Sequence, residues 1–241
     1  MRLLFLFLSA FFLSNTAHAD EELKEYADYQ VLHVKNTIKS IDLTLLESID
    51  FLNRNLGKEE ATLHKSLLQY AERTPGLRAI IVTDTKGKLK LDSFSYPTKN
   101  INLADREYVK NATALNNQSL YIGQPVVGRS SGTAFLPFSR ALLNANKESQ
   151  GVIAAIMHPG FLIKQDMLCA QCFVAVFNSH QKLVVSYPTN ASFPDDFIAM
   201  LQAESQGHVI KHQLNGQPVT TLKAPISDFG LTLTVSKFSN Q

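Results

Sequence analysis

The sequence predicts an α+β protein in which a long N-terminal helix precedes two modules, each built on an antiparallel sheet. Three observations carry this prediction. Residues 21–56 contain neither Gly nor Pro and repeat apolar residues at helical spacing. Short runs rich in Val, Ile, Leu and Phe follow, bounded by turn residues. The order strand, turn, strand, Pro-containing loop, helix and three strands then occurs twice.

The N-terminus has the pattern of a secretory leader. Arg2 precedes an apolar run over residues 3–13, and Ala17-His18-Ala19 has the form of an A-x-A cleavage site. We expect residues 1–19 to be a signal peptide, cleavage after Ala19 and a periplasmic mature chain; an uncleaved membrane anchor is the alternative. No later apolar run approaches the roughly 20 residues of a membrane helix. We therefore expect no second membrane segment and no output domain in this chain.

Residues 20–76 are predicted to form two helices. In the first, over residues 21–56, the apolar positions advance in steps of four and three, as in a coiled coil. One interpretation is a helix packed along the two modules; the other adds a homodimer formed through the same residues. The second helix runs from about residue 58 to 73 and ends at Thr74-Pro75-Gly76. The apolar positions of the first helix are Ala27, Val31, Val34, Ile38, Ile41, Leu45, Leu52 and Leu56.

The two modules are expected at residues 77–159 and 160–241. In the first, strands are predicted at 77–83, 88–95, 121–127, 133–142 and 151–157, with a short helix capped by Asn102 or Asp105. In the second, helices are predicted at 161–168 and from Phe193, and strands at 173–178, 182–186, 208–214, 218–224 and 231–238. Tyr96-Pro97 and Tyr187-Pro188 open corresponding loops.

Cationic and phenolic side chains gather along the first module. Cationic groups held at strand ends beside a short helix can form a site for a small anion. Each also has a structural interpretation, as a surface ion pair or a core aromatic residue. The candidate ligand-binding residues are Arg106, Tyr108, Tyr121, Arg129 and Arg140.

The same region carries a family resemblance. Together with the leader, the long helix and the two PAS-like halves, it resembles the double Cache family of extracytoplasmic sensor domains, as found in chemoreceptors and diguanylate cyclases. The resemblance implies a larger module that binds a small ligand and a smaller second module that passes the signal on. The residues that carry it are Asp105-Arg106-Glu107-Tyr108, Ile122-Gly123-Gln124-Pro125, Gly128-Arg129, Ser131-Gly132, Pro137-Phe138-Ser139-Arg140 and Gly151-Val152-Ile153.

Two departures from the family bear on the ligand. Members that bind free amino acids carry Arg-x-Trp-Tyr, where this chain has Arg106-Glu107-Tyr108-Val109, and an Asp at the end of a strand, where this chain has Ile156. The arginine can still hold a carboxylate. An ammonium without a carboxylate partner would cost several kcal/mol, by order of magnitude, in a closed pocket. We therefore expect a carboxylate or another small anion and not an ordinary amino acid.

The two cysteines stand three apart, at Cys169 and Cys172. An oxidising compartment favours a local disulfide, ahead of free buried thiols and of metal or redox chemistry. Haem attachment needs a histidine after the second cysteine, where Phe173 stands.

The functional hypothesis is a periplasmic sensor that binds a small ligand and signals through a separate membrane protein. The alternative is a ligand-free interaction protein that acts through residues 21–56. No motif of a hydrolase, metalloprotease or nucleotide-binding enzyme occurs, so we expect no enzyme activity, cofactor or metal. The net charge of +2 comes from scattered residues and indicates no nucleic-acid partner.

Overall fold

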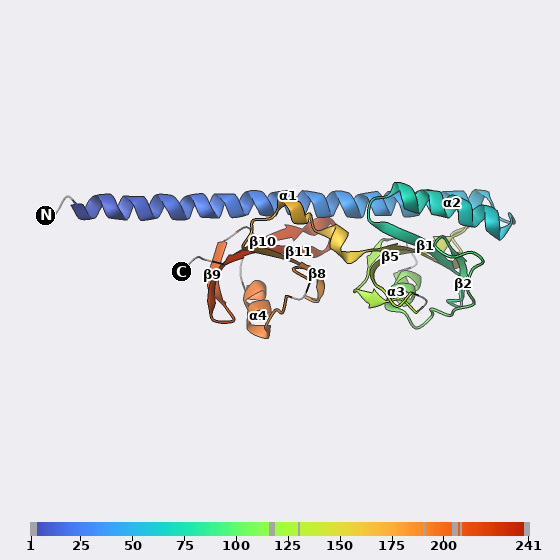
Figure 1. Cartoon of the computed structure of the whole chain (residues 1–241). Helices are drawn as coiled ribbons and strands as arrows, with labels where there is room; N and C mark the ends of the chain where they lie inside the picture. Colours follow the sequence, from blue (N-terminus) through green and yellow to red (C-terminus); the bar gives the residue numbers. More distant parts are fainter. Residues whose placement is uncertain are drawn as a thin grey trace. The chain divides into compact units, whose positions relative to one another are not determined.

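In the computed structural model, one helix, α1 (Leu4–Arg54), runs through the leader and the predicted long helix (Figure 1). The structure describes residues 4–115, 119–129, 131–189, 191–203, 207 and 209–238, with side chains from residue 21 onward. Across these residues no helix combines the length and the apolar character needed to cross a membrane.

The chain divides into two compact units. Residues 36–162 form one, here called the cavity unit, and residues 1–35 with 163–241 form the other, here called the C-terminal unit. The boundary between the modules was expected between residues 159 and 160, and the structure has it between Leu162 and Ile163. The first part of α1 belongs to the C-terminal unit and its last part to the cavity unit.

The cavity unit is built on one antiparallel sheet. Its strands are β1 (Leu77–Thr83), β2 (Leu89–Asp92), β3 (Tyr121–Ile122), β4 (Val126–Val127), β5 (Ala134–Leu143) and β6 (Ser149–Met157). They are ordered β2-β1-β6-β5-β3, with β4 also paired to β5. Helix α2 (Glu60–Arg73) packs beside α1, where Tyr70 meets the Phe51 ring edge-on. Helix α3 (Glu107–Leu115) covers the other face of the sheet (Figure 1).

The C-terminal unit repeats this strand order. Its sheet is ordered β8-β7-β11-β10-β9, and α4 (Asp195–Ala203) takes the place of α3. Its strands are β7 (Cys172–Phe177), β8 (Leu183–Tyr187), β9 (Val209–Leu214), β10 (Gln217–Ile226) and β11 (Leu231–Phe238). The peptide bonds before Pro97 and Pro188 are both cis, at corresponding places in the two units. The predicted α+β class and the internal repeat are confirmed.

The apolar stripe of α1 is buried inside its own chain. In the cavity unit Ile38, Ile41 and Leu45 are wholly inaccessible to solvent. Ser48 is also buried and donates a hydrogen bond of 2.7 Å to the carbonyl of Thr44 one turn earlier. The stripe thus packs against the chain's own core. The homodimer through residues 21–56 stays a prediction, and a charge at Ile38 or Ile41 would disrupt this core.

Two predicted elements differ from the structure. The strand expected at 121–127 is split into β3 and β4. Their registers against β5 differ by one residue, since Ile122 pairs with Phe138 and Val126 with Phe135, and Pro125 between them has no N–H to give to a ladder. The helix expected at 161–168 is replaced by two short 3-10 turns, η1 (Pro159–Leu162) and η2 (Gln165–Met167). Between them the buried amide of Gln30 accepts from the N–H of Lys164 at 3.0 Å and donates to its carbonyl at 2.8 Å.

Candidate functional site

A cavity lies in the cavity unit, against the face of the sheet that α3 covers, and its volume is about 190 Å³. That is smaller than the roughly 300–1,000 Å³ of pockets for drug-sized ligands. An apolar cavity of about 150 Å³ already holds a benzene-sized molecule. The cavity therefore suits a molecule slightly larger than benzene.

Most of the cavity wall is apolar, and this wall belongs to the core of the cavity unit. An apolar lining excludes water and so strengthens any charge interaction made inside. Ile156, the residue on which the expected ligand class rested, is part of this wall. The apolar lining residues are Ala79, Ile81, Leu89, Phe94, Ile101, Leu103, Phe135 and Ile156, with Gly128 between them.

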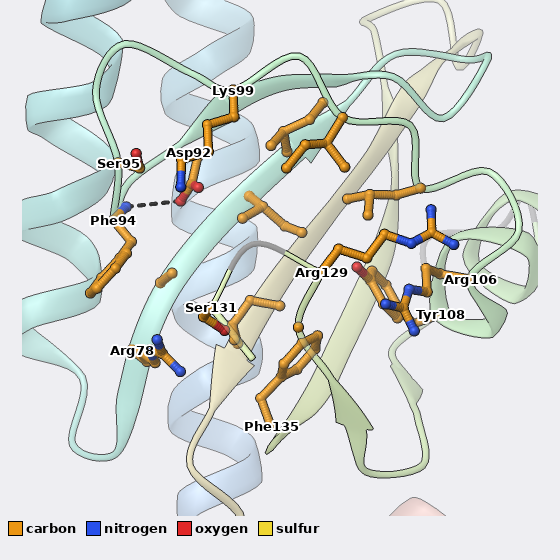
Figure 2. A pocket seen from close by; sticks show the side chains of 17 residues that line it. Arg78, Asp92, Phe94, Ser95, Lys99, Arg106, Tyr108, Arg129, Ser131 and Phe135 are labelled. Atoms are coloured by element: carbon orange, nitrogen blue, oxygen red, sulfur yellow. Dashed lines mark hydrogen bonds between the residues drawn. The ribbon is translucent and has the colours of Figure 1, made fainter. Parts of the chain in front are cut away.

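Arg106 and Tyr108 enter the cavity together, from the start of α3 (Figure 2). The guanidinium of Arg106 donates to the carbonyl of Val127 at 3.0 Å, and no carboxylate of the described chain pairs with it. Tyr108 is only 2% exposed, and its ring meets Phe135 edge-on. Burial raises the pKa of Tyr108 to about 12, so its hydroxyl is neutral and can donate at any physiological pH. Within the described residues that hydroxyl has no hydrogen-bond partner, and in Figure 2 it points into the cavity.

Arg78 lines the cavity because of an irregularity in β1. Leu77 pairs with Met157 and Ala79 pairs with Ile156, so Arg78 is an extra residue between two consecutive pairs. Such a β-bulge puts an additional side chain out of the normal alternation and re-aims it. Arg78 and Ala79 consequently both line the cavity. The Arg78 guanidinium stacks over the Phe94 ring at 5.0 Å, and no carboxylate of the described residues pairs with it.

Asp92, the last residue of β2, contributes a carboxylate to the lining. This carboxylate accepts the N–H of Phe94 at 2.9 Å, and the Asp92 carbonyl contacts Nδ1 of His64 on α2, also at 2.9 Å. Lys99 lines the same cavity, and its positive charge acts on this carboxylate. Burial raises the pKa of Asp92, and this outweighs the opposing effects of the backbone hydrogen bonds, His64 and Lys99.

Arg129 also lines the cavity, but its charge is already engaged. It forms an ion pair with Asp105 and donates to the carbonyl of Asn102. This pair lowers the pKa of Asp105. Because Asp105 neutralises it, Arg129 is a poorer anion site than Arg106, although both were expected from the sequence.

Tyr121 and Arg140 are not among the residues that line the cavity. Arg140 donates two hydrogen bonds to Asp42 on α1, at 2.6 and 2.7 Å, and this ion pair ties β5 to the helix. Tyr121 lies on the short edge strand β3, where burial raises its pKa and Asn111 of α3 hydrogen-bonds its side chain. The structure thus brings together Arg106, Tyr108 and Arg129, and gives Arg140 and Tyr121 other partners.

Arg78 and Asp92 were not expected as site residues from the sequence. The available signal was weak: a single arginine at the start of an apolar strand, and a single aspartate at the end of the next strand. The sequence does not reveal the bulge that turns Arg78 toward the cavity, or the strand end that turns Asp92 toward it.

The two cysteines form a disulfide, Cys169–Cys172, just before and at the start of β7. No cluster of His, Cys, Asp or Glu in the described part of the chain could hold a metal ion.

Known structures of sensory domains share this fold. The extracellular domain of the putative histidine kinase rpHK1S-Z16 has a TM-score of 0.81 at 18% identity, covering 93% of this chain and 96% of that chain. The ligand-binding domain of the Campylobacter jejuni chemoreceptor Tlp3, in complex with L-norvaline, has a TM-score of 0.71 at 11% identity, covering 92% and 91%. That of the Pseudomonas fluorescens chemoreceptor CtaA, in complex with L-serine, has a TM-score of 0.69 at 14% identity, covering 92% and 98%. No family model and no curated protein matches the sequence. The long helix with two modules, expected from the double Cache resemblance, is confirmed as the fold.

The expectation that the ligand is not an ordinary amino acid is contradicted. Tlp3 domains of the same fold are in complex with L-norvaline, isoleucine and L-valine, and CtaA domains with L-serine and L-alanine. The expectation rested on Ile156 in place of a carboxylate. In the structure a carboxylate enters the cavity from a different strand, at Asp92, so an ammonium inside would have a partner.

Proposed function

We propose that this chain is an extracytoplasmic sensor module whose cavity binds a small amino acid or a related carboxylate. One observation carries the proposal: a mostly apolar cavity holds the guanidinium of Arg106, which has no carboxylate partner in the described residues, beside the buried side chain of Tyr108. A guanidinium binds a carboxylate through two parallel hydrogen bonds, and a neutral phenol adds a third donor.

Asp92 adds a carboxylate to the cavity, on the side opposite Arg106 and Tyr108 (Figure 2). A carboxylate whose pKa is raised by burial gains stability when a cation reaches it. A cationic group of the ligand supplies that cation, while the apolar wall accommodates the rest of the ligand. The amino acids bound by Tlp3 and CtaA support this chemistry.

We further propose that the chain is exported by its leader, with cleavage after Ala19, and that it signals to a separate membrane protein. The similarity to the extracellular domains of a histidine kinase and of chemoreceptors supports a sensory role over a catalytic one. N-terminal sequencing of the exported protein tests the cleavage: a first residue other than Asp20 contradicts it.

A thermal-shift screen tests the binding proposal. The mature chain is mixed with each of the common L-amino acids and with small carboxylates, and its Tm is compared with that of Arg106→Gln. Arg54→Gln is the matched control, because Arg54 is exposed at the end of α1, does not line the cavity and donates to the carbonyl of Asp50.

At a ligand concentration of 100 Kd, binding stabilises the native state by about 2.7 kcal/mol. For a chain of this size that corresponds to a rise in Tm of about 5–10 °C. We expect this rise in the wild type and in Arg54→Gln and its loss in Arg106→Gln. A screen in which no compound raises Tm, or in which Arg106→Gln responds as fully as the wild type, overturns the proposal.

A further inference from the structure

We infer that access to the cavity is controlled from α2, where Glu60 and His64 hold residues 94–100 at the cavity's rim. This inference rests on the proposed function, because a controlled entrance matters only for a cavity that binds a ligand. Residues 94–100, here called the rim segment, lie between the end of β2 and the residues that precede α3. Release of the rim segment from α2 widens the entrance, and its return closes the cavity over a bound ligand.

The rim segment is the part of this connection that leaves the sheet. Ser93 is still paired with β1, because its N–H donates to the Ile80 carbonyl at 3.0 Å and its hydroxyl accepts from the Ile80 N–H at 2.8 Å. Ile101 is paired again, because its carbonyl accepts from the N–H of Leu89 at 2.9 Å. Between these two points no residue of the rim segment belongs to a strand or a helix. Ser93 and Ile101 are therefore the hinges of the rim segment.

The rim segment forms one side of the entrance to the cavity. Phe94, Ser95 and Lys99 line the cavity from this side (Figure 2). Phe94 is 62% exposed, whereas Ala79 and Ile156 in the cavity wall are only 4% and 7% exposed. A ligand therefore passes the exposed rim before it reaches the inner wall. A large apolar side chain as exposed as Phe94 is stabilised when it closes over a ligand.

Two side chains of α2, one helical turn apart, hold the rim segment. Glu60 lies in the first turn of α2, and its Oε1 accepts the N–H of Thr98 at 2.8 Å. His64 donates from Nδ1 to the carbonyl of Asp92 at 2.9 Å, since a carbonyl can only accept, and its ring lies 5.3 Å from the Tyr96 ring. Hydrogen bonding from Thr98 lowers the pKa of Glu60, so its carboxylate is ionised at neutral pH and accepts strongly. The rim segment is thus tied to α2 near each of its ends.

Glu60 and His64 act on the ligand only through the rim segment. Neither is among the residues that line the cavity, so both are positioning residues. Glu60 is also exposed, and water can take over its hydrogen bond when the rim segment moves away. The two contacts therefore bias an equilibrium between a closed and an open rim without preventing opening.

Cysteine labelling measures access to the cavity without a ligand. Ala79→Cys places a thiol in the cavity wall, and Cys169 and Cys172 do not compete for the reagent because they form a disulfide. The probe is methyl methanethiosulfonate, and the rate of labelling is followed by mass spectrometry of the mature chain. Ile80→Cys is the reference, since Ile80 is wholly inaccessible and does not line the cavity, so a thiol there reacts only when the unit unfolds. If Ala79→Cys does not fold, Ile156→Cys places the thiol in the same wall.

Four substitutions on α2 are combined with each thiol variant. We expect Glu60→Ala and His64→Ala each to speed labelling at position 79 by about three- to tenfold, the factor by which loss of one such hydrogen bond shifts an equilibrium. Glu60→Gln keeps an acceptor oxygen for the N–H of Thr98 and should restore slow labelling. The matched control is Glu59→Ala, which removes a neighbouring carboxylate that makes no capping hydrogen bond and should leave the rate unchanged.

The outcomes separate this inference from the proposed function. Equal acceleration at positions 79 and 80 shows general destabilisation and overturns the control from α2. Labelling in Glu60→Ala that is no faster than in Glu59→Ala overturns it as well. Either result leaves the proposed function standing, because the thermal-shift screen reports binding whether or not the entrance is controlled. A screen without any response removes the proposed function, and the labelling rates still decide whether α2 controls access.

Discussion

Replacing Arg140 with leucine should destabilise the cavity unit and leave ligand binding intact, which separates a structural arginine from a binding one. The guanidinium of Arg140 donates from Nε and Nη2 to the two oxygens of Asp42, at 2.6 and 2.7 Å. The two side chains are only 11% and 23% exposed. Breaking a buried ion pair from one side costs about 3–5 kcal/mol, because the remaining charge is left without a partner. Since Asp42 keeps some contact with water, we expect a loss of about 2–4 kcal/mol.

The assay is thermal unfolding of the wild type, Arg140→Leu and the double variant Asp42→Leu/Arg140→Leu. For a chain of this length 1 kcal/mol shifts Tm by about 2–4 °C, so the single variant should melt about 4–16 °C lower. The double variant leaves no unpaired charge and should recover most of this loss. A double variant as unstable as the single one contradicts the reasoning. So does a single variant that melts normally but no longer responds to ligand, because that result would return Arg140 to the binding site.

Three further predictions concern the backbone, the acid in the cavity and the disulfide. Gly151→Ala should cost more than about 4 kcal/mol in urea unfolding, since φ is +136° and a Cβ would lie 1.9 Å from a backbone oxygen. At Gly132 φ is +64° and no atom lies within 4 Å of an added Cβ, so Gly132→Ala should cost only about 1 kcal/mol. Equal losses of stability in the two variants contradict this. Burial raises the folded-state pKa of Asp92 above 3.8. The stability that the Asp92 side chain contributes is therefore complete below pH 3.8, and it is lost as pH rises through the folded-state pKa. Without ligand, Asp92→Asn should therefore gain Tm relative to the wild type from about pH 4 upward, and parallel curves of Tm against pH refute the assignment. Replacing Cys169 and Cys172 together with serine should cost about 2 kcal/mol, the chain-entropy value for so small a ring; unchanged urea unfolding contradicts it.

The fold could be predicted because most of its elements have local signals. The strands at 77–83 and 231–238 match β1 and β11 residue for residue, since apolar runs bounded by turn residues define them. The helix expected at 161–168 failed for a long-range reason. Gln30, 134 residues away, bonds both backbone groups of Lys164, and no local pattern reports that contact.

The candidate site could be predicted only in part, and the reason is again distance in sequence. Arg106 directly precedes α3 and Tyr108 lies in its first turn, so the family resemblance was enough to place them together. The Arg140–Asp42 pair joins residues 98 positions apart, and an ion pair of that kind leaves no trace in the spacing of charges. Arg78 was missed because regular alternation along β1 would not direct it to the same side as Ala79, whereas a bulge does.

A crystal structure of the mature chain with a saturating amount of the amino acid that gives the largest thermal shift tests the central claim most directly. We expect the ligand inside the cavity unit, between Ala79, Tyr108 and Ile156, with its carboxylate on the guanidinium of Arg106. A cavity filled by the protein's own side chains at saturation, or a ligand bound away from Arg106, would contradict it.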